Sequence, residues 1–244
     1  MLKRISGLSF LCIMASSLAF NAPAKAVETQ VLTPFTAKYK VSKGRLNLGS
    51  AKRQLSQIGE NRFTFSYFSD LSLLILSDHR RETSELIIEQ NQKVKPLRYL
   101  FKREGTGSDK STTLEFTNGQ VLDVEADRPI DVAKDIQWYD EVSYQLQLKL
   151  DLAAGKQEMQ YYLVNHKKRD KLYHFKVVAE ELLEVPAGKI ETVKLQRIRD
   201  DSSDRVTEFW LAPKLGYLLV RIRQERGGSE VADAQLEQYV FNPL

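Results

Sequence analysis

Apolar and polar side chains alternate with a period of two residues along most of this chain. In the first run, Phe35, Ala37, Tyr39 and Val41 are separated by threonine and lysine. Alternation of this kind indicates β-strands that bury one face and expose the other. The same pattern recurs at residues 63–67, 173–179, 193–195, 218–222 and 239–241.

Glycine and asparagine separate these runs where tight turns are needed. Asn118-Gly119 is the strongest hairpin signal, because both residues readily adopt the positive φ angles of a two-residue turn. Further turns are predicted at Lys43-Gly44, residues 59–61, residues 105–108, Gly188 and Gly227-Gly228. About a dozen short strands at this spacing predict an antiparallel meander in one domain.

Residues 131–155 break the alternation, since they are rich in Gln, Leu, Lys, Asp and Ala. Asp140 is suited to cap a helix that Gly155 would end. The competing interpretation is a strand, because the apolar residues from Tyr144 to Leu152 also alternate. Helix propensity and the cap favour a helix at residues 140–153, packed on the sheet. The predicted fold class is therefore α+β, mainly antiparallel β.

The first 26 residues have the three zones of a secretory signal peptide. Lys3 and Arg4 are followed by an apolar stretch at residues 8–20 and by Ala24-Lys25-Ala26, whose small side chains suit signal peptidase. The stretch is shorter than the roughly 20 residues of a membrane-spanning helix. We predict cleavage after residue 26, a mature domain at residues 27–244, and a periplasmic location.

Cleavage also changes the composition of the protein. It removes Cys12, the sole cysteine, so that the mature chain has no thiol. It leaves 33 basic and 32 acidic residues, and this near-neutral balance does not suggest nucleic-acid binding. No second apolar run of the mature chain reaches membrane-spanning length.

Several segments carry a family resemblance. They are Glu184-Val185-Pro186-Ala187-Gly188-Lys189 with the strand after it, Phe209-Trp210-Leu211-Ala212-Pro213, residues 217–224, and Phe35-Thr36-Ala37-Lys38-Tyr39. Together they resemble the exported bacterial proteins of the domain of unknown function 3108 family. The resemblance implies a strongly curved sheet or open half-barrel around the helix, similar to periplasmic lipoprotein carriers, and no catalytic motif.

Candidate catalytic and metal-binding residues are few. His166 and His174 flank a predicted hairpin, where they can face each other, but a zinc site needs three or four ligands. Ser77-Asp78-His79 has the residue types of a triad, although neighbours in sequence rarely meet triad geometry. We therefore predict no metal, no cofactor and no enzymatic activity.

Leucine and isoleucine are concentrated at residues 71–76, directly before Asp78-His79-Arg80-Arg81. Such a cluster can line an acyl-chain cavity or touch a membrane, with the arginines at anionic head groups. We favour the simpler interpretation of a buried strand followed by a charged turn. The candidate ligand-binding residues are Leu73, Leu74, Leu76, Trp138, Tyr162 and Trp210.

The leading functional prediction is a periplasmic protein that binds or carries an apolar or amphiphilic ligand, such as a lipid or a lipoprotein acyl chain. The alternative is an envelope assembly module that binds a protein partner at a sheet edge. A hydrolase is the least favoured possibility.

Overall fold

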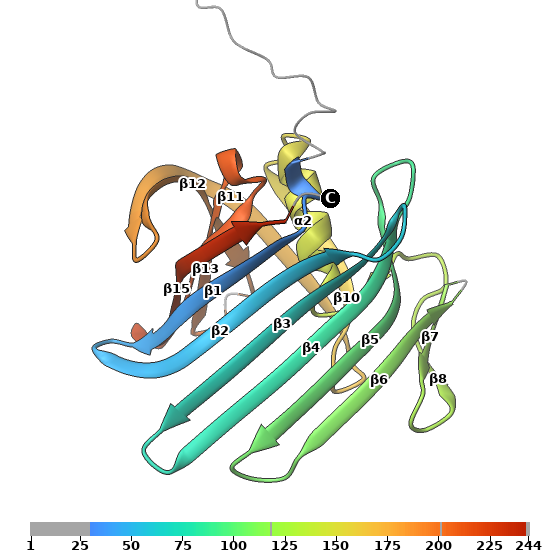
Figure 1. Cartoon of the computed structure of the whole chain (residues 1–244). Coiled ribbons are helices and arrows are strands. Elements are labelled where there is room, and N and C mark those ends of the chain that lie inside the picture. The colour runs from blue at the N-terminus through green and yellow to red at the C-terminus, as the bar shows by residue number, and fades with distance from the viewer. Residues whose placement is uncertain (1–29, 118, 201, 243–244) are drawn as a thin grey trace, which may run out of the picture.

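The structure is a computed structural model that describes residues 30–117, 119–200 and 202–242. Within these residues, fifteen strands form one sheet and helix α2 packs against it (Figure 1). The strands are β1 Phe35–Lys43, β2 Leu46–Gln57, β3 Arg62–Leu73, β4 Leu76–Ile88, β5 Val94–Gly105, β6 Lys110–Thr117, β7 Gln120–Asp123, β8 Arg128–Ile130, β9 Trp138–Tyr139, β10 Glu158–Val164, β11 Asp170–Val185, β12 Gly188–Ile198, β13 Arg205–Ala212, β14 Leu218–Arg226 and β15 Ser229–Phe241; helix α2 is Ser143–Ala153, and a short 3-10 helix covers Pro213–Leu215.

The sheet follows the order of the chain, with one exception at its middle. Strands β1 to β8 pair as successive neighbours on one side, and β9 to β15 do so on the other. Strands β1 and β15 pair with each other and join the two halves. Neighbours are antiparallel except β9 and β10, which are parallel. The sheet is not closed by hydrogen bonds, because β8 and β9 remain its edges.

This arrangement confirms the predicted fold class of mainly antiparallel β with one packed helix. The implied strong curvature or half-barrel shape stays a prediction. The predicted signal peptide, residues 1–26, lies outside the described residues. Within the described residues, no helix combines the length and apolar character needed to cross a bilayer.

The hydrophobic core lies on one face of the sheet, referred to here as the inner face. Phe35, Leu55 and Phe65 are cross-strand neighbours on β1, β2 and β3, and each is almost completely buried. The rings of Phe35 and Phe65 meet edge to face, with centroids 6.1 Å apart. Such cross-strand pairs stabilise the observed register of the sheet.

Helix α2 is buried on nearly all sides, which explains its ambiguous sequence pattern. Tyr144, Leu146, Leu148, Leu150 and Leu152 are all buried, although they point in different directions around the helix. A helix whose apolar side chains lie on more than one side is surrounded by the core rather than packed on it by one face, and here even Gln147, Lys149 and Asp151 are buried. The two-residue alternation that suggested a strand therefore reflects a surrounded helix.

The ends of α2 agree with the prediction to within one turn. The helix begins at Ser143 rather than at Asp140. Asp140 nevertheless caps the segment, because its Oδ1 accepts hydrogen bonds from the backbone N–H groups of Val142 and Ser143, each at 2.8 Å. Ser84 on β4 donates a further hydrogen bond to Oδ2 of Asp140 at 2.7 Å. Gly155, with a φ of 83°, follows the last helical turn as predicted.

The predicted hairpins at Lys43-Gly44, Gly188 and Gly227-Gly228 are confirmed. The prediction of a buried strand at residues 71–76 is wrong. Leu74 and Ile75 form the turn between β3 and β4, and their side chains are 97% and 94% exposed. A short apolar run carries no information on whether it is a strand or a turn, because its burial depends on what the rest of the chain places around it.

The turn between β10 and β11, residues 165–169, lies against the distant strands β5 to β7. Thr112 on β6 donates a hydrogen bond to the backbone oxygen of His166 at 2.8 Å. The imidazole of His166 stacks on Phe101 of β5, with centroids 4.2 Å apart. Nζ of Lys168 lies 2.7 Å from Oδ2 of buried Asp123 on β7. Side-chain contacts thus join parts of the sheet that no backbone ladder connects.

Candidate functional site

A cavity of about 230 Å³ lies between the N-terminal end of α2 and the inner face of the sheet, and it is referred to here as the central cavity. Strands from both halves of the sheet contribute to its wall. The apolar part consists of Val142, Phe209, Leu219 and Ile222; the tyrosines are Tyr39, Tyr67, Tyr144 and Tyr173; the charged residues are Arg53, Glu82, Glu141 and Arg197.

Arg53 enters the cavity from a position that alternation assigns to the core. It lies between buried Ala51 and Leu55 on the inner face of β2. Its Nη1 donates a hydrogen bond to Oε1 of Gln145 on α2. Its guanidinium carbon lies 5.8 Å from the centre of the Tyr67 ring. The arginine is therefore held by an amide and an aromatic ring, without a carboxylate.

Arg197 enters from the opposite half of the sheet, two residues after buried Leu195 on β12. Its guanidinium carbon lies 3.4 Å from the centre of the Tyr173 ring, within the range of a cation–π contact. Its Nε is buried and has no hydrogen-bond partner among the described residues. Neither Arg53 nor Arg197 forms an ion pair within the part of the chain that the structure describes.

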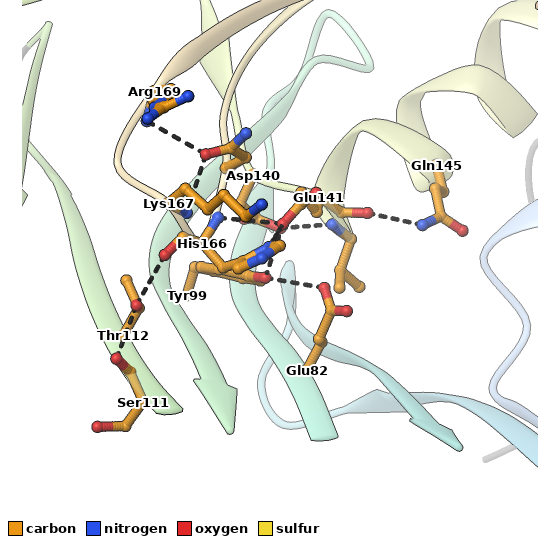
Figure 2. Close-up of polar contacts among 12 residues, drawn as sticks. Glu82, Tyr99, Ser111, Thr112, Asp140, Glu141, Gln145, His166, Lys167 and Arg169 are labelled. Carbon is orange, nitrogen blue, oxygen red and sulfur yellow. Dashed lines mark hydrogen bonds and ion pairs between the residues drawn. The ribbon is translucent and has the colours of Figure 1, made fainter. Parts of the chain in front are cut away.

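Figure 2 shows a cluster of acidic and aromatic groups, of which Glu82 and Glu141 line the same cavity. The hydroxyl of Tyr99 lies 2.8 Å from Oε2 of Glu82 and 3.4 Å from Oε2 of Glu141. The same oxygen of Glu141 accepts a hydrogen bond from the backbone N–H of His166 at 3.0 Å and lies 2.5 Å from Nδ1 of that residue. Strands β4 and β5, the start of α2 and the β10–β11 turn therefore meet at one point.

The two carboxyl groups of this cluster differ in acidity. Burial, together with the neighbouring charge of Glu141, raises the pKa of Glu82 to about 7. Burial also acts against ionisation of Glu141, but the hydrogen bonds from His166 outweigh it and hold the pKa of Glu141 below its usual value. Burial and the nearby carboxylates keep Tyr99 neutral by raising its pKa. Near neutral pH, the carboxyl group of Glu141 is therefore ionised, whereas that of Glu82 is present in both its protonated and its ionised form.

Aromatic rings form the wall of the cavity beside Arg197. Tyr144 on α2 lies 5.4 Å from Tyr173 and 5.8 Å from Phe175, measured between ring centroids. Phe175 in turn meets Phe209 edge to face at 5.5 Å. Packed rings of this kind form a rigid apolar surface, which suits a ring or a short alkyl chain of a ligand.

The two histidines of the β10–β11 hairpin do not face each other. His166 lies in the β10–β11 turn and contacts Glu141, whereas His174 pairs with Gln160 across the strands. Nε2 of His174 lies 2.5 Å from Oε1 of Glu158. Among the residues described, no three His, Cys, Asp or Glu side chains come together as a metal site.

The sequence Ser77-Asp78-His79 does not form a triad either. Asp78 binds Arg80 and Arg103 at 2.7 and 2.8 Å, while His79 lies 3.0 Å from Asp70. Adjacent residues of a strand point to opposite faces, so Asp78 and His79 diverge.

The family described as protein of unknown function (DUF3108) matches residues 35–234, which extend from β1 into β15. The chain belongs to the DUF3108 family. The resemblance seen in the sequence is thereby confirmed over most of the chain. No curated protein matches this sequence.

Solved structures with a similar fold are known outside the DUF3108 family. A β-barrel-like protein of domain of unknown function DUF1849 from Brucella abortus has a TM-score of 0.57 and 12% identity, over 86% of this chain and 98% of that one. At this identity the likeness shows the fold alone. A DUF1089 family protein from Pseudomonas aeruginosa is more distant, with a TM-score of 0.41 and 7% identity over 70% of this chain and 87% of that one.

In this DUF3108 protein, the six candidate ligand-binding residues lie in three separate places. Leu73, Leu74 and Leu76 are at the exposed β3–β4 turn. Trp138 and Tyr162 pack edge to face on β9 and β10, with centroids 5.7 Å apart. Trp210 is buried between Lys194 and Arg221, whose charged groups lie 4.9 and 5.1 Å from its ring centre. None of the six lines the central cavity, and ligand binding by them stays a prediction.

The residues of the central cavity were not identified from the sequence. One signal was present: Arg53 and Arg197 occupy inward positions of strands whose neighbouring inward positions are apolar. A charged side chain at a core position of a strand is uncommon unless it is paired. That the two arginines meet in one cavity could not be predicted from the sequence, because 143 residues separate them in the chain.

Proposed function

We propose that this protein is a non-enzymatic periplasmic binding or carrier protein that holds an amphiphilic ligand with an anionic group in the central cavity. In this proposal the sheet is an open barrel that closes around α2 and the ligand. The observation that carries the proposal is that two arginines, Arg53 and Arg197, line one cavity and form no ion pair with a carboxylate among the described residues.

An arginine that is removed from water without a counter-ion loses hydration that its surroundings must replace. Gln145 and the rings of Tyr67 and Tyr173 replace part of it. Glu82 and Glu141 line the same cavity, but neither forms an ion pair with Arg53 or Arg197 among the described residues. A carboxylate, sulfate or phosphate of a ligand would supply these arginines with a charged acceptor, because such groups match the planar donors of a guanidinium. Nε of Arg197 is buried and has no hydrogen-bond partner among the described residues, so the protein satisfies this guanidinium incompletely.

The volume of the cavity limits the size of the ligand. A volume of about 230 Å³ corresponds to about eight groups of the size of a water molecule. This is enough for a short alkyl chain or a ring against Phe209, Leu219 and Ile222, with the anionic group at the arginines. The acyl chains of a lipoprotein together exceed this volume. The ligand proposed for the central cavity is therefore a small amphiphile, or one end of a longer one.

The alternative of a protein partner at the sheet edge has less support. The edge strands β8 and β9 have only three and two residues. Such short edges offer few backbone groups for the addition of another strand.

A hydrolase also has less support. The neighbouring carboxyl groups of Glu82 and Glu141 are of the kind used in acid–base chemistry, but Tyr99 and His166 already bind them.

Calorimetry with two matched probes tests the proposal. Octanoate and octan-1-ol share one alkyl chain and differ in the charge of the head group. We expect the mature chain at pH 8 to bind octanoate at least about tenfold more tightly than octan-1-ol, since one charge-assisted pair is worth about 1.5–3 kcal/mol. Equal affinity for the two probes, or no binding of either, would count against the proposal.

Variants of the two arginines locate the site. Arg53→Met and Arg197→Met remove the charge with little change in length, and each should abolish the preference for octanoate. Arg226→Met is the matched control, because the side chain of Arg226 is 63% exposed, pairs with Asp204 and does not line the cavity. A preference that persists in both cavity variants would exclude these arginines as the anion site.

A further inference from the structure

The turn between β3 and β4 presents an apolar tip to solvent. It consists of Leu73, Leu74, Ile75 and Leu76, which are 40%, 97%, 94% and 53% exposed. Leucine and isoleucine side chains are seldom exposed together to this extent, because each loses the free energy that burial would supply. The tip lies at the end of a long hairpin and outside the central cavity (Figure 1).

The backbone of this turn is also unfavourable for its residues. Leu74 has a φ of 56°, a conformation that glycine, asparagine or aspartate adopt at lower cost. Two-residue hairpins of this type prefer glycine at the first central position. Folding alone therefore favours neither the backbone conformation nor the exposure of Leu74. Both features are explained if the tip makes a contact outside the chain.

Two neighbouring hairpins end beside this tip, at the same end of the sheet (Figure 1). Gly49 of β2 pairs with Leu71 of β3, which places the β1–β2 turn next to the tip. On the other side of the tip lies the β5–β6 turn. The backbone N–H of Thr106 in this turn donates a hydrogen bond to the backbone oxygen of Ser77 on β4 at 2.9 Å. The β1–β2 hairpin adds another exposed apolar side chain, Leu46, at 56% exposure.

The neighbouring hairpins carry exposed positive charges. Lys43 and Arg45 lie in the β1–β2 hairpin and Lys110 at the start of β6, and none of them forms an ion pair within the described residues. Asp109 and Glu230 oppose them; Oε1 of Glu230 accepts a hydrogen bond from the backbone N–H of Gly44 at 2.6 Å, and its carboxylate also contacts Arg223. Asp78 is bound by Arg80 and Arg103, so it does not offset these charges. The end of the sheet thus combines a protruding aliphatic tip with a surplus of free cations.

We propose that the β3–β4 tip inserts into the interface of a membrane that contains anionic lipids. The leucine and isoleucine side chains enter the boundary between head groups and acyl chains, while Lys43, Arg45 and Lys110 contact lipid phosphates. A protein partner would need an apolar groove to receive so convex a tip, whereas a lipid surface accepts it without a complementary shape. This contact is separate from the central cavity and does not depend on a ligand there.

Vesicle flotation of the mature chain tests this proposal. We expect binding to vesicles of phosphatidylcholine with phosphatidylglycerol, and at least about tenfold weaker binding to phosphatidylcholine alone, because each cation near an anionic surface contributes about 1 kcal/mol. The double variant Leu74→Gly with Ile75→Ser suits the turn better and should fold at least as well as the natural chain. It should lose vesicle binding by about tenfold or more, since two apolar side chains no longer insert.

Leu182→Ser is the matched control. Leu182 is 65% exposed and lies on the β11–β12 hairpin, so that its replacement should leave vesicle binding unchanged. The variant Lys43→Gln with Arg45→Gln should reduce the difference between the two vesicle types.

An inserted reporter checks the depth of the tip. In Ile75→Trp, tryptophan emission should shift to the blue on addition of anionic vesicles, against a constant signal from Trp138 and Trp210, which are 6% and 3% exposed. No binding of the natural chain to anionic vesicles, unchanged binding of the Leu74→Gly and Ile75→Ser variant, or capture of a protein at the tip without vesicle binding would overturn the proposal.

Discussion

Lys149 is a lysine in the hydrophobic core, and its replacement by methionine should stabilise the protein. The side chain is 5% exposed on helix α2. Its Nζ donates a hydrogen bond to the backbone oxygen of Val31 at 3.2 Å and lies 4.8 Å from the centre of the Phe35 ring. Burial, together with a smaller effect of the nearby charge of Arg53, lowers the pKa of Lys149 from 10.5 to about 7.

The direction of the pH effect follows from these two pKa values. Between pH 7 and 10.5 the unfolded chain binds a proton at Lys149 more tightly than the folded chain, so the free energy of unfolding rises with pH. From pH 7 to pH 9 the rise from this group is about 2 kcal/mol. At pH 7 the buried charge destabilises the folded state by about 4 kcal/mol relative to a neutral side chain.

Lys149→Met removes this cost but leaves the backbone oxygen of Val31 without its donor, which costs about 1 kcal/mol. We therefore expect a gain of about 3 kcal/mol at pH 7 and of about 1 kcal/mol at pH 9. Urea unfolding at both pH values, followed by the fluorescence of buried Trp138 and Trp210, measures the two gains. Lys189→Met, at a side chain that is 66% exposed, is the control and should change neither value.

The result that would refute this reasoning is a difference between Lys149→Met and the natural chain that is the same at pH 7 and pH 9. A variant that is less stable than the natural chain at pH 7 would refute it as well, because the packing of Lys149 would then outweigh its charge.

Further predictions concern the polar groups around the cavity and the helix. Burial raises the pKa of Glu82 to about 7, so the stability that this group contributes is present below pH 4.5 and lost as pH rises through 7. Glu82→Gln should therefore make the protein more stable by about 2 kcal/mol at pH 8 but not at pH 4.5, as measured by urea unfolding. Asp140→Ala should lower the free energy of unfolding by about 3 kcal/mol, because it leaves two backbone N–H groups and Ser84 without an acceptor. Asp140→Asn keeps one acceptor oxygen and should lose less; equal losses in the two variants would contradict the capping role. Tyr161→Phe removes a hydrogen bond of 2.7 Å to Oδ2 of buried Asp151. The variant should have a lower melting temperature, by an amount that corresponds to a loss of about 2 kcal/mol in the free energy of unfolding. Phe replacement at exposed Tyr239 should have little effect.

Much of the local structure was predictable from residue spacing. The alternation at Phe35, Ala37 and Tyr39 placed strand β1, and glycine placed the turns at Gly44 and Gly188. Strand and turn preferences act over a few residues, so a short stretch of sequence contains the information that decides them. Helix α2 was also located, with its start displaced from Asp140 to Ser143.

The burial of apolar residues was less predictable. The run at Leu73 to Leu76 and the run at Tyr144 to Leu152 are both rich in leucine, yet the first is an exposed turn and the second a surrounded helix. Composition describes how much apolar surface a segment has. Which surface becomes buried depends on elements that are distant in the sequence.

The sequence by itself determined the period-two strands, the glycine turns, the helix and the family. Only the tertiary structure decided that β1 pairs with β15, and that Arg53 and Arg197 meet in one cavity. It also decided that Glu141 of the α2 entry contacts His166 of a distant turn. The physical reason is that these contacts join residues far apart in the chain, and their formation depends on the folding of the whole sheet rather than on the preference of any one segment.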